Sequence, residues 1–333
     1  MLKLGILRRE QFLRYQAKRR IGRLFSLSTG RVSFRLLERP SQPATQDSEI
    51  FERLMPYVQL SSGTYRTTYR GRFRNLDSEV NQLLTRIFDP QKDLKVEDWA
   101  ASACLTSSEW ADALFPLFAR LSFVASDILL FLIEVQDGKR YSYVFEPDGA
   151  PLQLVKSPFV IRMTPPEPRA LPLNRWLCTQ AWSRWNALQP FSDSVHRWIA
   201  SPSKETLNAD GMKFAKLSLI HPEAERLAER DARFTIQAHS VFESLSSPAH
   251  VIRTMNIFNN AYFSEQQLKV GAQAVIGSLL PRGIWILGRT VCEAPPAHEV
   301  TIFRKDSFNR LEVLRRLGSG SEIEKLVLSH FGA

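Results

Sequence analysis

The spacing of apolar and polar residues changes character along the chain. Residues 50–88 carry apolar positions three or four residues apart, and Asp89-Pro90 ends that pattern, so a helical region is predicted there. From residue 94 onward, short apolar runs alternate with helical stretches. The predicted strands are 94–99, 121–127, 233–239, 251–256, 284–288, 300–304 and 311–315. This alternation predicts an α/β fold with a mostly parallel sheet, which binds its ligands at the carboxyl ends of the strands.

The final two predicted strands differ from the others in their connection. Only a short segment, about the length of a hairpin loop, separates residues 300–304 from residues 311–315. A connection of this length joins antiparallel neighbours, because a parallel crossover needs a dozen residues or more. The sequence therefore predicts an antiparallel hairpin at the C-terminal end of a seven-stranded sheet.

An insertion interrupts the alternation over residues 136–215. It begins with a β-hairpin around Pro147-Asp148-Gly149, continues through proline-rich residues 164–172, and contains helical stretches between about 173 and 200. Four tryptophans lie in those stretches: Trp176, Trp182, Trp185 and Trp198. They either line a substrate pocket or pin the insertion to the core, and the sequence leaves both readings open.

The segment VEDWAASACLTSSEWADAL, residues 96–114, joins the first predicted strand to a helix over 106–120. Five small residues form the connection between them. Thr106 or Ser107 is the expected N-cap of the helix, and Glu109 stands where a capping box places its acid. A strand, a tight turn and a helix N-terminus in this order are typical of a ligand-binding loop.

Charge is concentrated at the start of the chain. Residues 1–40 contain 11 Lys and Arg against two acids, a net +9 of the total +10, so the other 293 residues are nearly neutral. This argues against a nucleic-acid surface spread over the whole protein. The basic amphipathic segment packs on the body of the protein, lies on an anionic membrane, or contacts RNA, with membrane favoured over RNA.

The composition places the protein among soluble globular chains. No run approaches the ~18 uncharged apolar residues of a membrane span, so no integral span is expected. The three cysteines are widely spaced and the six histidines scattered, which indicates neither a disulfide framework nor a metal site. We expect a cytoplasmic protein, with peripheral membrane association through residues 1–40 as an alternative. The predicted divisions are the basic segment 1–40, a polar linker over 40–49, a helical region over 50–90, and a domain over 91–333 that carries the insertion.

Three pieces of the sequence resemble class I S-adenosylmethionine-dependent methyltransferases, which have a Rossmann-like fold. Asp98, Ala100, Ser102 and Cys104 stand at the places of the family's acidic-x-Gly-x-Gly/Ser-x-Gly loop, here depleted of glycine. Asp127 ends the second strand, about where the family's acid binds the ribose hydroxyls. VIRTMNIFNNAYFSEQQL and SLLPRGIWILG are similar to the fourth strand, the helix after it and the turn before the fifth strand. The resemblance covers roughly 94–135 and 215–328.

The resemblance implies S-adenosylmethionine as the cofactor. The cofactor-binding residues it implies are Asp98, Ala100, Ala101, Ser102, Asp127 and His239. On the acceptor side it implies Asn256, Asn259 and Tyr262 as the catalytic residues. In physical terms, a glycine loop admits positive φ and adds no Cβ, and alanine keeps most of that room where φ stays negative.

Several of these residues also have structural interpretations. Asp127 could also be a helix N-cap, although cofactor binding is favoured; His239 could be a structural histidine, and Tyr262 part of the core. Methyl transfer needs little from side chains beyond alignment of the acceptor with the methyl group, so the absence of an acid–base dyad is compatible with an enzyme. The prediction is methyl transfer to an unidentified acceptor, a small molecule being favoured. The alternative is a catalytically inactive methyltransferase-like protein that binds a protein, RNA or membrane. A nicotinamide-dependent oxidoreductase fits poorly, because G-x-G-x-x-G is absent and the sheet ends in a hairpin.

Overall fold

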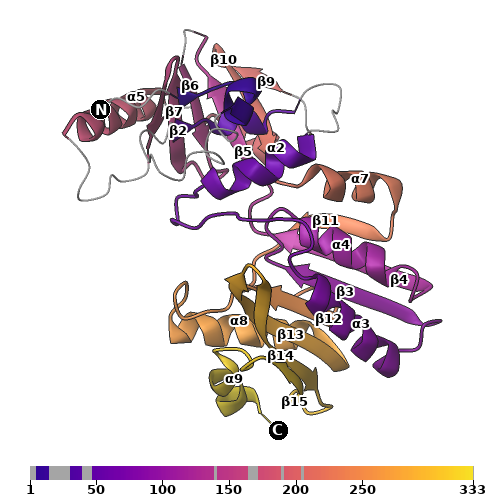
Figure 1. Ribbon diagram of the computed structural model, residues 1–333. Coiled ribbons are helices and arrows are strands. Elements are labelled where there is room, and N and C mark those ends of the chain that lie inside the picture. Colours follow the sequence, from indigo (N-terminus) through magenta and orange to yellow (C-terminus); the bar gives the residue numbers. More distant parts are fainter. Residues whose placement is uncertain are drawn as a thin grey trace. The chain divides into compact units, whose positions relative to one another are not determined.

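The computed structural model describes residues 5–14, 31–39, 47–138, 141–163, 172–188, 191–203 and 206–332 (Figure 1). The chain forms two compact units, each built from two stretches of sequence. Met1–Thr67 and Phe131–Leu219 form the first, which we call the β unit. Thr68–Leu130 and Ile220–Ala333 form the second, which we call the α/β unit. The predicted helical region over 50–90 is divided between the units: its residues up to 67 belong to the β unit, and residues 68–90 belong to the α/β unit.

The α/β unit contains a seven-stranded sheet within the described residues, in the order β11-β4-β3-β12-β13-β14-β15. The strands are β3 (Asp93–Trp99), β4 (Arg120–Asp127), β11 (Phe234–Ala238), β12 (Ala249–Met255), β13 (Leu279–Glu293), β14 (Pro296–Lys305) and β15 (Leu311–Leu317). The first five are parallel, and β14 is antiparallel to both of its neighbours. The predicted α/β fold, with a mostly parallel sheet and an antiparallel C-terminal hairpin, is confirmed.

Helices cover both faces of this sheet (Figure 1). They are α3 (Arg74–Ile87), α4 (Leu105–Leu114), α7 (Pro222–Arg230), α8 (Glu265–Ser278) and α9 (Glu324–Phe331). The first three pack on one face around Phe123 and Ile286, and the last two pack on the other around Trp99 and Trp285. The alternation of side chains along each strand produces these two separate cores, as a sheet buried on both faces requires.

The predicted capping box at the start of α4 is wrong. The helix begins at Leu105, and its N-cap is Cys104 at a left-handed φ, with no capping hydrogen bond from the side chain. The Glu109 carboxylate instead accepts the backbone N–H of Gly71 at 2.9 and 3.0 Å. A capping box is present at α8, where Ser264 and Gln267 cap the helix reciprocally.

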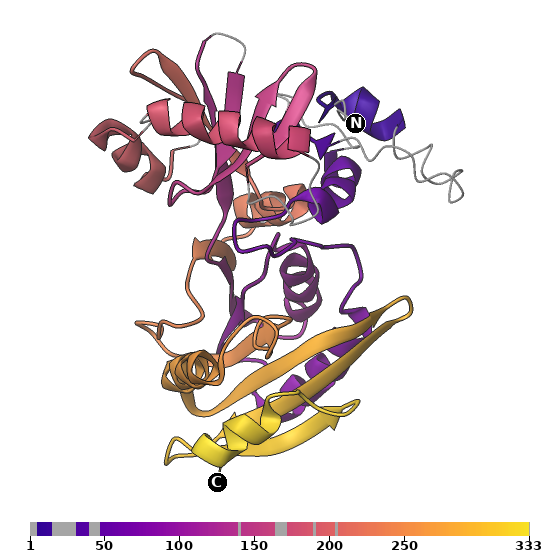
Figure 2. The same cartoon turned by 90° about the vertical axis from the view of Figure 1, so that its left-hand side faces the viewer.

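β13 is longer than predicted, and with β14 it forms a long hairpin, visible in Figure 2. The turn predicted over residues 280–283 lies within the strand, at the point where the register between β12 and β13 shifts. Arg282 has a φ of 67° there, so a bulge rather than a chain-reversing turn accommodates the residues.

The β unit contains a second, antiparallel sheet, in the order β8-β7-β6-β5-β10-β9. Its strands are β5 (Phe131–Gln136), β6 (Tyr141–Phe145), β7 (Pro151–Lys156), β8 (Phe159–Arg162), β9 (Leu207–Ala209) and β10 (Met212–Ser218). The predicted hairpin is β6–β7. The interruption of the α/β pattern therefore supplies a complete sheet of its own.

Two of the four tryptophans pin the inserted helices to this sheet. Trp185 of α5 (Pro172–Leu188) and Trp198 of α6 (Asp193–Ala200) lie in the hydrophobic core of the β unit. Trp182 Nε1 donates to the Met163 carbonyl oxygen at 2.6 Å. Trp176 is 57% exposed. The core-packing interpretation therefore holds for Trp185 and Trp198.

The described parts of the basic N-terminal segment belong to the β unit. β1 (Gly5–Ile6) pairs with β2 (Arg31–Val32), and the 3-10 helix η1 (Phe34–Leu37) follows. The side chain of Gln153 donates to the Val32 carbonyl oxygen at 3.0 Å and accepts the N–H of Phe34 at 2.9 Å. Arg35 pairs with the buried Glu134 at 2.6 Å. These contacts agree with the packing interpretation of the segment.

Residues 15–30 of the basic segment, and residues 40–46 of the predicted linker, lie outside the described residues. After the linker come α2 (Asp47–Leu54) and the 3-10 helix η2 (Met55–Tyr57). Among the residues that the structure describes, no helix combines the length and apolar character that crossing a bilayer takes. In the same residues, no group of three or more His, Cys, Asp or Glu side chains is arranged to hold a metal ion.

Candidate cofactor site

The connections from two adjacent strands, β3 and β12, leave the sheet toward opposite faces. β3 continues into α4 on one face, while β12 continues toward α8 on the other. In open α/β sheets such a switch point leaves a crevice at the carboxyl ends of the strands, where ligands bind. The loop 100–104 and Asn256 follow β3 and β12 directly, and Asp127 ends the neighbouring β4. The fold thus gathers the principal predicted site residues at one edge.

The loop after β3 has a glycine-type backbone without glycine. Ala100, Ser102 and Cys104 have φ angles of 55°, 55° and 58°. The condition under which Ala100 keeps most of the room of a glycine, a negative φ, is therefore not met. These are the three positions at which the resemblance placed glycines, and a left-handed residue with a Cβ costs about 1–2 kcal/mol. The loop keeps this conformation despite that cost.

Hydrogen bonds from the neighbouring segments hold the loop in place. Ala101 donates its N–H to the Ser126 carbonyl oxygen at 2.9 Å, and Ser102 donates its N–H to Asp127 Oδ2 at 2.8 Å. The Ala103 carbonyl oxygen accepts the N–H of His221 at 2.8 Å. With three such anchors, the loop is fixed against β4 and the start of α7.

Asp127 uses both carboxylate oxygens. Besides the bond to Ser102, its Oδ1 accepts the N–H of Leu129 at 3.1 Å. No helix follows in this part of the described chain, which continues directly into β5, so the N-cap interpretation is wrong. Each carboxylate oxygen has a second lone pair, and binding of a ribose diol stays a prediction.

A small polar group surrounds Asp127. The rings of His239 and Trp99 lie 4.5 Å apart between centroids. The backbone N–H of His239 donates to the Asp127 carbonyl oxygen at 3.2 Å. Burial lowers the pKa of His239, which favours the neutral imidazole. Within the described chain, Ser126 Oγ and His239 Nε2 are among the buried atoms of this group that have no hydrogen-bond partner. Sequence reasoning missed Ser126, although it directly precedes the predicted Asp127.

Asp98 forms a buried ion pair with Arg253. Its carboxylate accepts hydrogen bonds from Arg253 Nε at 2.8 Å and from Ser107 Oγ at 2.6 Å. Arg253 is 1% exposed, reaches Asp77 with Nη1 at 2.7 Å, and lies 4.2 Å from the centroid of the Trp110 ring. The sequence did indicate that Arg253 has a buried partner, because it lies inside the mostly apolar strand sequence VIRTM, where a charge must be paired.

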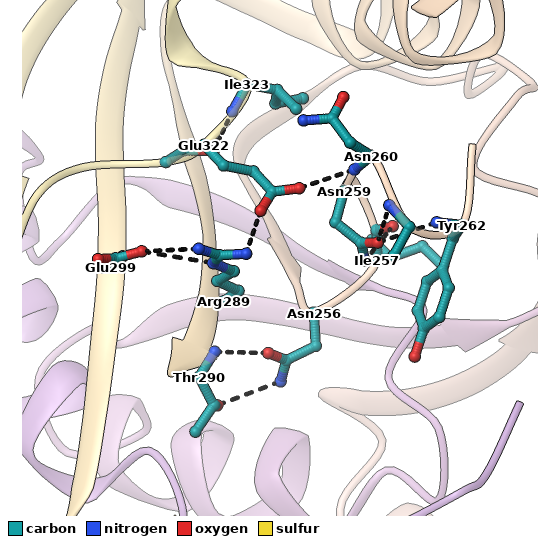
Figure 3. A network of polar contacts seen from close by, with 12 residues as sticks. Asn256, Ile257, Asn259, Asn260, Tyr262, Arg289, Thr290, Glu299, Glu322 and Ile323 are labelled. Atoms are coloured by element: carbon teal, nitrogen blue, oxygen red, sulfur yellow. Dashed lines mark hydrogen bonds and ion pairs between the residues drawn. The ribbon is translucent and has the colours of Figure 1, made fainter. Parts of the chain in front are cut away.

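The predicted acceptor-side residues stabilise the backbone at the ends of β12 and β13 (Figure 3). Asn256, at a φ of 61°, accepts the N–H of Thr290 at 2.6 Å and donates to Thr290 Oγ1 at 3.3 Å. Asn259 Oδ1 accepts the N–H groups of Ala261 and Tyr262 at 3.1 and 3.0 Å. The Tyr262 side chain is 51% exposed. Their catalytic roles stay predictions.

A second set of contacts ties the same region to the C-terminal segment (Figure 3). Arg289 pairs with Glu299 at 3.2 Å and also with Glu322. Glu322 accepts the N–H of Asn260 at 2.7 Å. Asn256 and Asn259 offer no group that readily exchanges a proton.

Sequence comparison finds no relative: no family model matches the chain, and no curated protein matches it. Structure comparison finds similarity to class I S-adenosylmethionine-dependent methyltransferases. The methyltransferase domain of the citrinin polyketide synthase is 9% identical, with a TM-score of 0.35, over 76% of this chain and 41% of that one. An O-methyltransferase family protein from Burkholderia thailandensis is 10% identical, with a TM-score of 0.31, over 85% and 52%.

The amino pentose methyltransferase CalS10 from Micromonospora echinaspora, solved with S-adenosylmethionine, is 9% identical, with a TM-score of 0.31. That match covers 79% of this chain and 86% of CalS10. The chain spans about two fifths of the length of the citrinin domain chain. The similarities concern the fold alone. The α/β unit has a methyltransferase-like Rossmann fold, as its strand order and hairpin indicate independently.

Proposed function

We propose that the α/β unit binds S-adenosylmethionine at the carboxyl ends of β3, β4 and β11 and transfers its methyl group to a small acceptor. The adenosine lies by Trp99, Ser126 and His239, with Asp127 on the ribose. The methionine part lies along the loop 100–104. The acceptor approaches from the side of Asn256 and is positioned against the methyl group, which supplies much of the catalysis without a base.

The observation that carries the proposal is the pair of unpartnered buried atoms beside Asp127. Ser126 Oγ and His239 Nε2 have no hydrogen-bond partner in the described chain, and an unsatisfied buried polar group costs about 1–3 kcal/mol. A nucleoside offers ring nitrogens and hydroxyls to such groups. The imidazole of His239, tilted by 58° against the buried indole of Trp99, also presents a flat ring on which a purine can stack.

The first turn of α4 supports placing the methionine part of the cofactor along the loop 100–104. The helix starts without a side-chain cap and has no acidic residue in its first turn. Its N–H groups therefore favour a negatively charged group, such as the carboxylate of the methionine part of the cofactor.

A second candidate is a methyltransferase-like protein that binds the cofactor, or a partner, without transferring a methyl group. The internal bonding of Asn256 and Asn259 favours it, because both side-chain amides already stabilise the backbone. The two candidates differ in turnover and agree in cofactor binding.

The first experiment is isothermal titration calorimetry of the full chain with S-adenosylmethionine and with S-adenosylhomocysteine. We expect micromolar binding that Ser126→Ala and Asp127→Asn each weaken by about tenfold, the cost of one hydrogen bond to a buried or charged group. Asp127→Asn keeps an oxygen for one of the two backbone amides whose hydrogen bonds Asp127 accepts, those of Ser102 and Leu129. Ser122→Ala, at the exposed start of the same strand, is the matched control. Absence of heat with either ligand contradicts the proposal.

The second experiment separates the two candidates. The protein is incubated with S-adenosylmethionine and a panel of small hydroxyl, amine and acid acceptors, and S-adenosylhomocysteine is quantified by mass spectrometry. Acceptor-dependent formation of S-adenosylhomocysteine supports methyl transfer. Binding without turnover on any acceptor favours the inactive methyltransferase-like protein.

A further inference from the structure

A polar cavity lies in the α/β unit beside the start of α3. It has a volume of about 210 Å³ and is lined by Arg70, Gly71, Arg72, Arg74, Asn75, Pro296 and His298. Three arginines and a histidine thus meet in a space suited to a small group rather than to a whole cofactor. None of the predicted site residues lies in it.

Two of the arginines are compensated by acids. Arg70 makes two bonds of 2.6 Å to the carboxylate of Glu223, and Arg72 pairs with Glu293 at 2.6 Å. Arg74 differs. Among the residues that the structure describes, its guanidinium has no hydrogen-bond or ion-pair partner, and it lies 3.5 Å from the position of a Cβ on Gly71. Its charge is available to a ligand.

His298 contributes a fixed acceptor. Its Nε2 lies 3.0 Å from the Arg72 carbonyl oxygen, and since a carbonyl oxygen only accepts, Nε2 carries the proton. Nδ1 therefore holds a lone pair, and this atom is buried without a partner within the described chain. The ring is fixed further by Phe73, 5.2 Å away between centroids.

The guanidinium of Arg74 and Nδ1 of His298 determine which chemical group fits the cavity. Arg74 calls for an anionic oxygen, while Nδ1 of His298 calls for a hydrogen-bond donor. A singly protonated phosphate provides both, because it has charged oxygens and one O–H. A carboxylate provides only the oxygens. Asn75 also lines the cavity, and a side-chain amide is a hydrogen-bond donor.

The cavity also lies close to the proposed acceptor position. His298 of β14 is paired in register with Thr290 of β13, and Thr290 is hydrogen-bonded to Asn256 at the end of β12. Two strand spacings separate Asn256 from His298, about 10 Å. A phosphate held in the cavity can therefore belong to a molecule whose other end reaches the carboxyl end of β12.

We infer that this cavity binds a phosphate group, and that the group is carried by the methyl acceptor. The assignment to the acceptor rests on the proposed function, whereas phosphate binding does not. Free inorganic phosphate and a phosphate monoester present the same chemistry to Arg74 and His298, so inorganic phosphate is the first probe.

The test follows the imidazole resonances of the full chain, labelled at histidine, during titration with inorganic phosphate at constant ionic strength. His298→Gln identifies the His298 signal. We expect a saturable shift of that signal, and an apparent Kd that Arg74→Gln weakens by about tenfold, as loss of a charge-assisted hydrogen bond does. Arg86→Gln, exposed in the last turn of the same helix, is the matched control and leaves the Kd within about twofold. A parallel titration with acetate is expected to give at most a weak shift.

Two results overturn the inference that the cavity binds phosphate. One is a His298 signal that does not shift when phosphate is added. The other is an Arg86→Gln variant that weakens phosphate binding as much as Arg74→Gln. Calorimetry with S-adenosylmethionine separates this failure from failure of the proposed function. If the protein binds the cofactor but not phosphate, only the phosphate-site inference is contradicted. If it binds phosphate but not the cofactor, only the proposed methyltransferase function is contradicted. If both bind, phosphorylated acceptors must be turned over faster than their dephosphorylated forms, and Arg74→Gln must reduce that preference; equal rates refute the acceptor assignment.

Discussion

Arg253 holds the carboxylate of Asp98 in a buried, two-pronged ion pair, with Nε to Oδ1 at 2.8 Å and Nη2 to Oδ2 at 2.5 Å. The pair joins β12 to β3 at the switch point, directly before the loop 100–104. The same guanidinium reaches Asp77 of α3 at 2.7 Å. One cation thus connects two central strands and a helix, and it supports the position of the proposed cofactor loop.

Replacing this arginine is expected to destabilise the protein strongly. Arg253→Met leaves Asp98 and Asp77 buried without their cation, and breaking such a pair costs about 3–5 kcal/mol of unfolding free energy. Urea unfolding measures the change. Arg120→Met is the control, because Arg120 pairs with Asp93 at the exposed start of β4 and its loss costs about 0.5 kcal/mol. Equal losses in the two variants contradict the importance given to burial.

The sharing of one guanidinium by two aspartates predicts a pH dependence. Burial raises the pKa of Asp77 to about 7, although Arg253 opposes the shift, and Asp98 and Glu109 add to it. The folded pKa lies above the unfolded value, so the contribution of Asp77 to stability is complete below about pH 4 and is lost as pH rises through about 7. Asp77→Asn removes this dependence while keeping an oxygen for Arg253.

The measurement is urea unfolding of wild type and Asp77→Asn between pH 4 and 8, roughly the window between the unfolded and folded pKa values of Asp77. We expect the stability of the variant relative to wild type to increase steadily as pH rises. Glu79→Gln, on the exposed surface of the same helix, is the control for removing a carboxylate from α3. A constant difference across the window shows that Asp77 is ionised throughout.

Lys305 caps the C-terminal end of α8. Its Nζ donates to the carbonyl oxygens of Ile276 and Leu279 at 2.8 and 2.6 Å, and the residue is 6% exposed. Lys305→Met fills a similar volume but removes the ammonium donor from two buried carbonyl oxygens, of which that of Ile276 keeps a backbone donor, the N–H of Leu279. Losing these bonds costs about 1–3 kcal/mol. Thermal unfolding measures the change. The control is Lys269→Met on the same helix, where the lysine is partly buried and pairs with Glu265. A variant as stable as wild type shows that water replaces the ammonium group.

The sheet could be predicted because each of its strands carries its own apolar run, and the C-terminal hairpin because its connection is short. The ion pair of Asp98 with Arg253 could not, since the residues are 155 positions apart and nothing local identifies the partner. The capping box failed for a related reason. Glu109 has the expected local spacing, but a backbone N–H from a distant segment, that of Gly71, takes its carboxylate.

The candidate site was predictable in position and less so in the roles of its residues. Asp127 and His239 stand at strand ends, and the topology brings them together. Asn256 and Asn259 also lie where the resemblance placed them, yet their amides bond to nearby backbone groups. A sequence gives the type and place of a polar side chain, whereas its partner depends on the packing of neighbouring strands.

The glycine-free loop gives the sharpest prediction about the candidate site. Ala100 and Ser102 have left-handed φ angles, so Ala100→Gly and Ser102→Gly each relieve strain and are expected to raise the unfolding free energy by about 1 kcal/mol. Ala103→Gly, at a position without positive φ, is the control and lowers it by a similar amount, about 1 kcal/mol, through the added freedom of the unfolded chain. Removing the Cβ at position 100 also widens the loop, so Ala100→Gly is expected to tighten binding of S-adenosylmethionine in calorimetry. Unchanged affinity together with higher stability shows that the cofactor does not approach this part of the loop, and lower stability shows that the backbone there is not strained.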